Sequence, residues 1–361
     1  MKQEYIGIII GSQLYREIVN GKQSQVLAFY EEAGKINNLI PVYLRLEDLQ
    51  PGLSETTGYV MNRNGKYQKN TIPKPFVIHN RGYQCSSAAK KQLKSLQAEG
   101  IIFFNEWNQY GKYKIHKLLA ESEDLRAHLP DTVQFNQSNM FEMMGKHREL
   151  IIKPSSGTFG RRNMKATRLN DSEWLLTYPQ KDRWQEEIIL VDRLPLKIDS
   201  LVTSGIYIIQ SRIRLAEYNN NPFDLRVSVQ RNGNGTWQVT GMVGKVAKTG
   251  SIVTNAAQGG ICFAFEDILR NLPDLDDKRV VADVEELSLK VAKQLSNQIE
   301  NLADIGLDVG ITKDGLPMFI ECNARDLRLT FRHALMFETW RDTYITPISY
   351  GKYLLTKRTS Q

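Results

Sequence analysis

Two acidic residues, Asp308 and Glu321, lie on either side of an Asp314-Gly315 pair that joins two apolar runs. An Asp-Gly pair between apolar runs is a strong signal for a β-hairpin. With a two-residue turn there, counting back along both strands places Asp308 opposite Glu321. Asn323 lies two residues beyond Glu321, so its side chain shares that face of the sheet.

Like charges directly opposite each other on a sheet are destabilising, so the two carboxylates need a cation between them. Mg²⁺ prefers oxygen ligands and readily shares its coordination sphere with nucleotide phosphates. Asp308, Glu321 and Asn323 would supply two carboxylates and an amide. The sequence therefore predicts a Mg²⁺ site on this hairpin, and the alternative is two exposed acids on a solvated face.

A second candidate site is segment 150–162, where a predicted strand ends in Lys153-Pro and a loop rich in Ser, Gly and Arg follows. Glycines let backbone N–H groups close around phosphate oxygens, and hydroxyl groups add donors. Lys153 at the strand end can reach into such a site as a point charge. The spacing is not that of a P-loop, and a surface hairpin turn is the alternative interpretation.

The length of 361 residues allows two or three domains, and a hydrophobic content of 41% is ordinary for a globular protein. No apolar run approaches the length of a membrane span, and no membrane partner is predicted. The start of the chain resembles a core strand rather than a signal peptide, so a cytoplasmic location is expected. The three cysteines, Cys85, Cys262 and Cys322, are widely spaced, which favours a reducing compartment.

The net charge of +7 suits an anionic ligand such as a nucleotide or an acidic substrate, and a merely basic surface is the alternative. The chain contains no RNP motif, zinc finger or long Lys/Arg block, so no sequence-specific nucleic-acid partner is predicted. The five histidines show no zinc-ligand spacing, which argues against a zinc enzyme.

Strand and helix signals alternate at the start of the chain, which predicts a small α/β domain without a GxGxxG dinucleotide motif. The clearest helix is Val280–Ala303, whose apolar residues form one stripe, and two further helices are predicted at Asp171–Tyr178 and Ile198–Val202. The fold class is α/β (α+β). The predicted domains are 1–105, 106–205 with the Gly-rich loop, and 206–361 with the metal hairpin.

Several motifs follow one another in a fixed order: Lys117, the Lys153 loop, Ile208-Ile-Gln210, Asp224-Leu-Arg226, Asn255-Ala-Ala-Gln-Gly259-Gly260, Asp308, and Glu321-x-Asn323. No single element is specific, but the ordered set with Asp-x₁₂-Glu-x-Asn resembles the ATP-grasp superfamily. Within it the chain is most similar to the YheC/YheD-type, spore-coat-associated family. The resemblance covers roughly residues 105–330, and Pro75–Arg81 fits the N-terminal domain of that family.

This resemblance implies an ATP-grasp fold behind a small N-terminal α/β domain, with ATP and Mg²⁺ as cofactors. It implies that Asp308, Glu321 and Asn323 hold Mg²⁺. It implies nucleotide contacts from Lys117, Lys153, Ser155, Ser156, Gly157, Gly160, Ile209 and Gln210. It implies catalytic roles near the transferred phosphoryl group for Arg226, Lys245, Asn255 and Arg325.

The chain departs from the pattern of many carboxylate–amine ligases, which carry an arginine two residues before the first metal acid. Here that position is Gly306, and a related arginine position is Lys245. Arg325 or Arg328, which follow Asn323, could replace the missing clamp or bind a carboxylate substrate. The alternative for both arginines is the start of a surface helix.

Three functions follow from the resemblance. In the first, ATP phosphorylates a carboxylate and an amine or other nucleophile attacks the acyl-phosphate; two lysines, a Gly-rich lid and a complete metal triad favour it. The second is a non-catalytic nucleotide-binding or structural spore-coat protein. The third is a kinase-like transfer to a hydroxyl group. The small-molecule or peptide substrates and any partners in the spore coat are not identified by the sequence.

Overall fold

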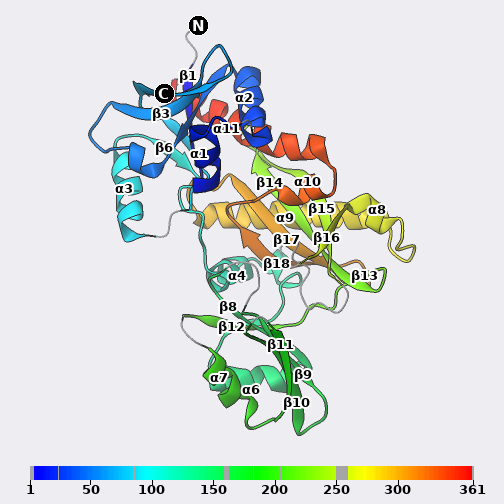
Figure 1. The fold of residues 1–361 in the computed structure, drawn as a ribbon. Coiled ribbons are helices and arrows are strands. Elements are labelled where there is room, and N and C mark those ends of the chain that lie inside the picture. The colour runs from blue at the N-terminus through cyan, green and yellow to red at the C-terminus, as the bar shows by residue number, and fades with distance from the viewer. Residues whose placement is uncertain are drawn as a thin grey trace.

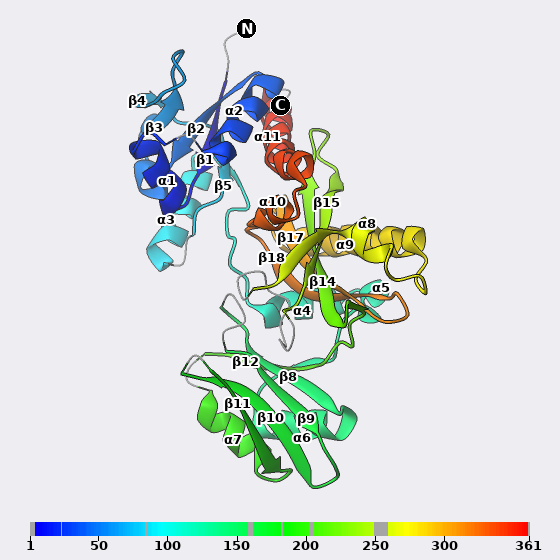
Figure 2. The same cartoon turned by 45° about the vertical axis from the view of Figure 1, so that its right-hand side comes forward.

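The computed structural model describes residues 4–22, 24–83, 86–157, 162–181, 183–202, 205–248 and 259–359. Three six-stranded sheets follow one another along this part of the chain. Figures 1 and 2 show the N-terminal sheet at the top, the C-terminal sheet in the middle and the second sheet at the bottom. The mixed α/β fold class expected from the sequence is confirmed.

The first sheet has the apolar strand β1 near its centre, in the order β4-β3-β2-β1-β5-β6. β1 pairs in parallel with β2 and β5, and its Ile6 and Ile8 side chains are fully buried. Parallel strands joined by helices are typical of α/β domains. The elements are β1 (Glu4–Ile9), α1 (Ser12–Val19), α2 (Gln25–Asn37), β2 (Leu39–Leu44), the 3-10 helix η1 (Leu46–Asp48), β3 (Glu55–Met61), β4 (Tyr67–Pro73), β5 (Val77–Asn80), α3 (Ser87–Ala98) and β6 (Ile102–Phe104).

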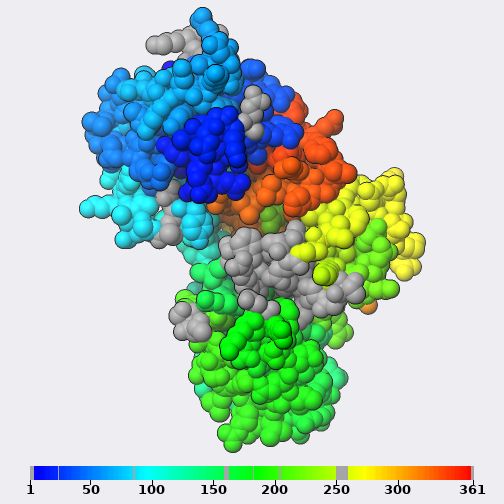
Figure 3. Space-filling model, viewed as in Figure 1, coloured from blue at the N-terminus to red at the C-terminus, as the bar shows by residue number. Residues whose placement is uncertain are grey.

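The second sheet has the order β11-β10-β9-β8-β12-β7 and forms the small subdomain at the bottom of the molecule (Figure 3). Helices α6 and α7 share one apolar core with its strands, in which Met140 and Ile198 are fully buried. The elements are β7 (Thr132–Gln134), α6 (Gln137–Lys146), β8 (Glu149–Pro154), β9 (Met164–Arg168), β10 (Glu173–Gln180), β11 (Arg183–Leu190), α7 (Leu194–Leu201) and β12 (Tyr207–Ser211).

The helix predicted at Asp171–Tyr178 is wrong, because the chain from Glu173 on forms the strand β10. Trp174, Leu176 and Tyr178 recur with a period of two, and all three are buried in the core shared with α6 and α7. The helix predicted at Ile198–Val202 corresponds to the second half of α7.

The C-terminal sheet lies between two long helices and has the order β16-β15-β14-β17-β18, and its sixth strand, β13, pairs with β14. The stripe predicted for Val280–Ala303 packs α9 on one face of the sheet. Helix α11 contacts β14 and β15 and also α2, so it joins this sheet to the N-terminal domain. The elements are α4 (Lys112–Ala120), α5 (Glu123–Arg126), β13 (Glu217–Tyr218), β14 (Asn221–Arg231), β15 (Trp237–Val246), β16 (Ile261–Ala264), α8 (Phe265–Leu269), α9 (Asp277–Gln298), β17 (Asp304–Ile311), β18 (Pro317–Asn323), α10 (Leu329–His333) and α11 (Phe337–Thr359).

Asp308 and Glu321 lie opposite each other on β17 and β18, as the sequence predicts, although the turn differs from the prediction. Thr312 N–H donates to the Leu316 carbonyl, so the loop holds three residues, and its last residue, Gly315, has φ of 85°. A register shift directly after Asp308 adds one residue to β18 and restores the predicted pairing. The bulge and the longer loop therefore cancel.

None of the helices among the residues that the structure describes is both long enough and apolar enough to cross a bilayer.

Candidate functional site

A cleft of about 1450 Å³ lies between the second sheet and the C-terminal sheet, with Tyr83, which follows β5 of the first sheet, also on its wall. The structure brings most of the predicted site residues to its walls, whereas Lys117 and Ile209 do not line it, and Gly160 and Asn255 lie outside the described residues. The predicted residues on its walls are Lys153, Ser155, Ser156, Gly157, Gln210, Arg226, Lys245, Asp308, Glu321, Asn323 and Arg325.

Asp308 is surrounded by cations from the neighbouring strands. Arg226 is its direct partner on β14, and the Arg226 Nε donates to the Asp308 Oδ1 over 2.8 Å. The Lys245 Nζ lies 3.0 Å from the same oxygen. Burial favours the neutral acid, but Arg226 and Lys245 outweigh it and hold the pKa of Asp308 well below its usual range. The positive charge that the facing acids require is thus present in the protein itself.

Glu321 pairs with Lys112, a residue that the sequence analysis did not select. The Lys112 Nζ lies 3.3 Å from the Glu321 Oε2 and donates to the Gly157 carbonyl over 3.0 Å. The backbone N–H of Lys112 donates to the Ser155 carbonyl over 2.7 Å. The lysine that α4 brings to the glycine-rich loop is therefore Lys112.

Lys117 is on another side of α4, because five residues of helix correspond to a rotation of about 140°. Its Nζ lies 5.8 Å from the centre of the Tyr113 ring. Sequence spacing alone could not separate Lys112 from Lys117, since both fall on one predicted helix. Ile115 and Leu119 are buried, so helical periodicity relative to them separates the sides of the helix on which the two lysines lie. Which of those sides faces the glycine-rich loop depends on how the helix packs on the sheet.

Lys153 is a buried ammonium group at the end of β8, with 6% of its surface exposed. Burial lowers the pKa of Lys153 to about 8; the nearby Lys112 lowers it too, while Glu321 and Asp308 oppose the change. Because the charge of Lys153 is poorly compensated, binding of an anion beside it would be favourable.

Gln210 and Ile209 point in opposite directions, as neighbours on a strand must. Gln210 lines the cleft and its Nε2 donates to the Thr132 Oγ1 over 2.8 Å. Ile209 is fully buried in the apolar core of the small subdomain. Apolar lining comes instead from Ile151, the partner of Gln210 on β8, and from Ile320 on β18.

Gly306 lies at the position where the sequence pattern led us to expect an arginine, and the structure leaves no room there for a side chain. A side-chain carbon on Gly306 would lie 2.6 Å from the Oδ1 of Asp326. Asp326 is fully buried, and its Oδ1 accepts a hydrogen bond from the Arg226 Nη1 over 3.0 Å. Arg226 thus approaches Asp308 from β14, and Asp326 fills the space beside Gly306.

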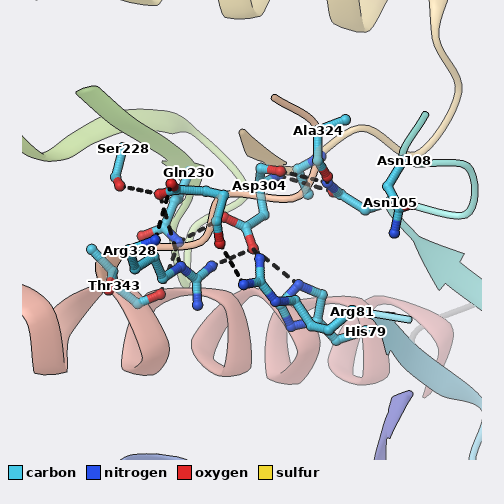
Figure 4. Close-up of polar contacts among 12 residues, drawn as sticks. His79, Arg81, Asn105, Asn108, Ser228, Gln230, Asp304, Ala324, Arg328 and Thr343 are labelled. Atoms are coloured by element: carbon cyan, nitrogen blue, oxygen red, sulfur yellow. Dashed lines mark hydrogen bonds and ion pairs between the residues drawn. The ribbon is translucent and has the colours of Figure 1, made fainter. Parts of the chain in front are cut away.

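A buried polar cluster around Asp304 joins the C-terminal sheet to the N-terminal domain (Figure 4). The Asp304 carboxylate interacts with the His79 Nε2 at 3.0 Å, with the Arg81 Nη1 at 3.2 Å, and with Arg328. The Gln230 Nε2 donates to its other oxygen over 2.8 Å. Burial lowers the pKa of His79 to about 4, so the ring is neutral at pH 7. Arg328 is therefore a buried structural residue, which rules out the surface-helix interpretation.

Whether the candidate residues can hold Mg²⁺ depends on which of their oxygen atoms are available as ligands. Among the described residues no cluster of three His, Cys, Asp or Glu side chains forms a metal site, so a metal would rely on Asp308, Glu321 and the Asn323 amide. In the part of the chain that the structure describes, the Asn323 side chain forms no hydrogen bond, so its Oδ1 is available as a ligand, and its buried Nδ2 has no acceptor. Two carboxylates and a free amide fit a hard cation that takes its remaining ligands from phosphate and water.

Comparisons with known proteins give a consistent result. A family model described as YheC/D like ATP-grasp matches residues 100–354. The endospore coat-associated protein YheD of Bacillus subtilis (strain 168) is 24% identical over 314 residues, covering 83% of this chain and 67% of YheD. The endospore coat-associated protein YheC of the same organism is 19% identical over 251 residues, covering 69% of each chain.

Solved structures share the fold. The ATP-grasp ligase PsnB, complexed with a phosphomimetic variant of its minimal precursor, Mg and ADP, matches with a TM-score of 0.52 at 14% identity, covering 96% of this chain and 98% of PsnB. D-alanyl-alanine synthetase A from Vibrio cholerae matches with a TM-score of 0.52 at 10% identity, covering 96% of this chain and all (100%) of the synthetase chain. At these identities the likeness concerns the fold.

Proposed function

The chain belongs to the YheC/D-like ATP-grasp family, and from this premise we propose that it is an ATP- and Mg²⁺-dependent ligase. The observation that carries the proposal is the convergence of Lys112, Lys153, Asp308 and Glu321 on one cleft. Residues 1–105 would bound the acceptor site, 106–205 would cover the nucleotide, and 206–361 would supply the metal ligands.

In this proposal the cations of the cleft bind the phosphates of ATP. Lys153 and Lys112 contact the phosphate oxygens, and Ser155, Ser156, Gly157 and Gly160 close over them. Gln210 faces the adenine. Arg226 and Lys245 lie beside the transferred γ-phosphoryl group, where positive charge stabilises the developing negative charge.

Asp308, Glu321 and Asn323 would hold Mg²⁺, which would supply positive charge that neutralises the phosphates. The carboxylate oxygen of the substrate attacks the γ-phosphorus, and the bond to the β-phosphate oxygen breaks, releasing ADP. An amine or another nucleophile then attacks the acyl carbon of the acyl-phosphate and inorganic phosphate leaves. Asn255 would lie near this acyl group.

A thermal-shift titration with ATP, with and without Mg²⁺, tests the nucleotide site. A ligand that binds only the folded state raises the unfolding midpoint by mass action. We expect a Mg²⁺-dependent rise in the wild type, its loss in Glu321→Ala, and its retention in Glu285→Ala, which removes an exposed acid from α9. An unchanged response in Glu321→Ala would contradict the metal assignment. Turnover is measured separately, as ADP release in the presence of amino acids or peptides.

A second function, a nucleotide-binding or structural protein of the spore coat without turnover, is favoured by one observation. Both oxygens of Asp308 already interact with Arg226, and one also interacts with Lys245, so the acid is neutralised without a metal. Two relatives named as endospore coat-associated support placement in the spore coat and partners there. Binding of ATP without ADP release in any substrate pool would identify this function.

A further inference from the structure

Arg325 is an arginine of the cleft that has no anionic partner. It follows β18, lines the cleft, and its Nε is buried without a hydrogen-bond acceptor. Among the described residues its guanidinium forms no ion pair or hydrogen bond. Asp182 is the only acidic residue in the sequence that lies outside the description. An arginine is usually placed in a partly buried position together with a carboxylate or phosphate.

Its surroundings add positive charge instead of removing it. A side-chain carbon on Gly11 would lie 3.1 Å from the Arg325 Nη2, so the guanidinium reaches the first residue before α1. That helix start has no side-chain cap and no acid in its first turn, and its dipole is positive.

Arg81 is a further cation in these surroundings. The Arg81 Nη2 donates to the backbone carbonyl of Asp326, the residue that follows Arg325. Arg81 itself is already paired with Asp304, so it brings a charge but no spare carboxylate.

Two other arginines of the cleft, Arg226 and Arg328, differ from Arg325 in this respect. Arg226 is paired with Asp308 and Asp326, and Arg328 is paired with Asp304. Arg325 and the positive end of α1 therefore meet, while the neighbouring Arg81 is already paired with Asp304. Within the described ranges of the chain Arg325 has no counter-charge of its own, which is unfavourable until an anion binds.

We propose that Arg325, facing the start of α1, binds a spectator carboxylate of the substrate, meaning an anionic group other than the one that is phosphorylated. This inference rests on the proposed ligase function and specifies its substrate class as a molecule with at least two acidic groups, such as an acidic amino acid or peptide. The cleft of about 1450 Å³ exceeds the roughly 300–1,000 Å³ of an ordinary ligand pocket and accommodates a second molecule beside a nucleotide. Exposed Tyr83 and Leu327 on its wall offer apolar contact to the rest of that molecule.

The first test needs no ATP chemistry. Phenylglyoxal modifies guanidinium groups that are free of ion pairs, and mass spectrometry of the peptides gives the rate at each arginine. We expect Arg325 to react faster than Arg226 and Arg328, and succinate to slow its modification severalfold. The matched neutral probe succinamide should have no effect. Equal effects of the two probes, or equal protection of the exposed Arg332, would overturn the inference.

The second test uses the substrate reaction. With an acidic dipeptide that stimulates ADP release, Arg325→Gln should raise the KM for the dipeptide by about 30-fold or more and leave the KM for ATP unchanged. Arg325→Lys should recover part of the loss, and Arg332→Gln, which removes the same charge outside the cleft, should have no effect. An unchanged dipeptide KM in Arg325→Gln would refute the inference. If ATP itself failed to bind the wild type, the ligase proposal would fail while succinate protection could still be observed.

Discussion

At the scale of single residues, the cleft is organised by charges that the fold leaves only partly compensated. Lys153 is buried with a lowered pKa, whereas Lys245, equally buried, is kept charged by Asp224 and Asp308. The difference follows from distance, since Lys245 lies 2.9 Å and 3.0 Å from two carboxylate oxygens. Lys153 forms no such contact among the described residues, so its charge is a cost to folding that a phosphate would remove.

Lys153→Met should therefore stabilise the free protein and abolish the response to ATP. The folded-state pKa of Lys153 lies below its unfolded value of 10.5, so at pH 7 the charge opposes folding, and stability should rise as pH increases from about 8 to 10.5. We expect a gain of about 1–3 kcal/mol in the free energy of unfolding at pH 7. Urea unfolding measures this gain, and a thermal-shift titration measures the loss of ATP binding.

Lys146→Met serves as the control for Lys153→Met, because it removes a lysine from an exposed i,i+4 ion pair with Glu142. It should leave the free energy of unfolding nearly unchanged and leave the ATP response intact, because exposed ion pairs contribute little. A destabilised Lys153→Met protein would contradict the assignment of a strained, uncompensated charge.

The two lysines of α4 can be separated by substitution. Lys112 lies between Glu321 and the glycine-rich loop, while Lys117 does not line the cleft. Lys112→Ala should weaken ATP binding by about tenfold or more, since a charge-assisted phosphate contact is lost. Lys117→Ala should bind ATP as the wild type does, and isothermal titration calorimetry measures both. If only Lys117→Ala weakened ATP binding, the sequence-based assignment of Lys117 as the phosphate contact would be right.

At the scale of secondary-structure elements, the β17–β18 hairpin positions the two candidate metal acids through two compensating irregularities. The loop has one residue more than a two-residue turn, and the bulge after Asp308 adds one residue to β18. Counting back from a two-residue turn gives the right pairing of Asp308 with Glu321, even though that turn does not form. The same sheet brings Arg226 opposite Asp308, because β14 and β18 are the two neighbours of β17.

Gly306→Ala tests how tightly these strands are arranged around Asp326. The added carbon would lie 2.6 Å from a buried carboxylate oxygen, so Asp326 must move and its ion pair with Arg226 must break. We expect a loss of about 2–4 kcal/mol in the free energy of unfolding. Gly306→Arg, which adds a larger side chain at the same place, should be at least as unstable.

Gly145→Ala is the matched control for Gly306→Ala, because the space around Gly145 in α6 is open. Alanine favours a helix over glycine, so this variant should gain up to about 1 kcal/mol. Equal stability of Gly306→Ala and wild type in urea would mean that Asp326 does not occupy the space beside Gly306.

At the scale of the whole molecule, Asp304 links parts of the chain that are far apart in the sequence. His79 and Arg81 come from the N-terminal domain, while Arg328 and Gln230 belong to the C-terminal part (Figure 4). Helix α11 packs between the same two parts and shares an apolar core with them. The N-terminal domain is thus joined by both charge and apolar contact to the sheet that carries Asp308.

The contacts of Asp304 that connect the N-terminal domain to the C-terminal sheet should weaken at low pH. The folded-state pKa of His79, about 4, lies below the ordinary 6.5, so the folded protein disfavours the protonated ring. The stability from this group is complete above pH 6.5 and is lost progressively as pH falls towards 4. The shift corresponds to about 3 kcal/mol, and His79→Gln, which cannot titrate, should lose correspondingly less stability between pH 7 and 4. Urea unfolding across this range measures it, and identical pH profiles would contradict the assignment.

Local signals in the sequence determined much of the fold and of the candidate site. Apolar periodicity predicted α9, the Asp-Gly pair predicted the β17–β18 hairpin, and spacing predicted that Asp308 faces Glu321. Those features depend on residues close together in the chain, whose hydrogen bonds and burial follow one repeat. The order of the motifs also identified the family.

Only the tertiary structure decided which charges meet. The cation beside Asp308 comes from β14 and β15, the partner of Glu321 is Lys112 rather than Lys117, and Ile209 faces a core while Gln210 faces the cleft. The strand at Asp171–Tyr178 likewise depends on α6 and α7, against which its side chains are buried. Each of these outcomes depends on how elements distant in the sequence pack together, and electrostatic energy at a buried site depends on distances that no local pattern encodes.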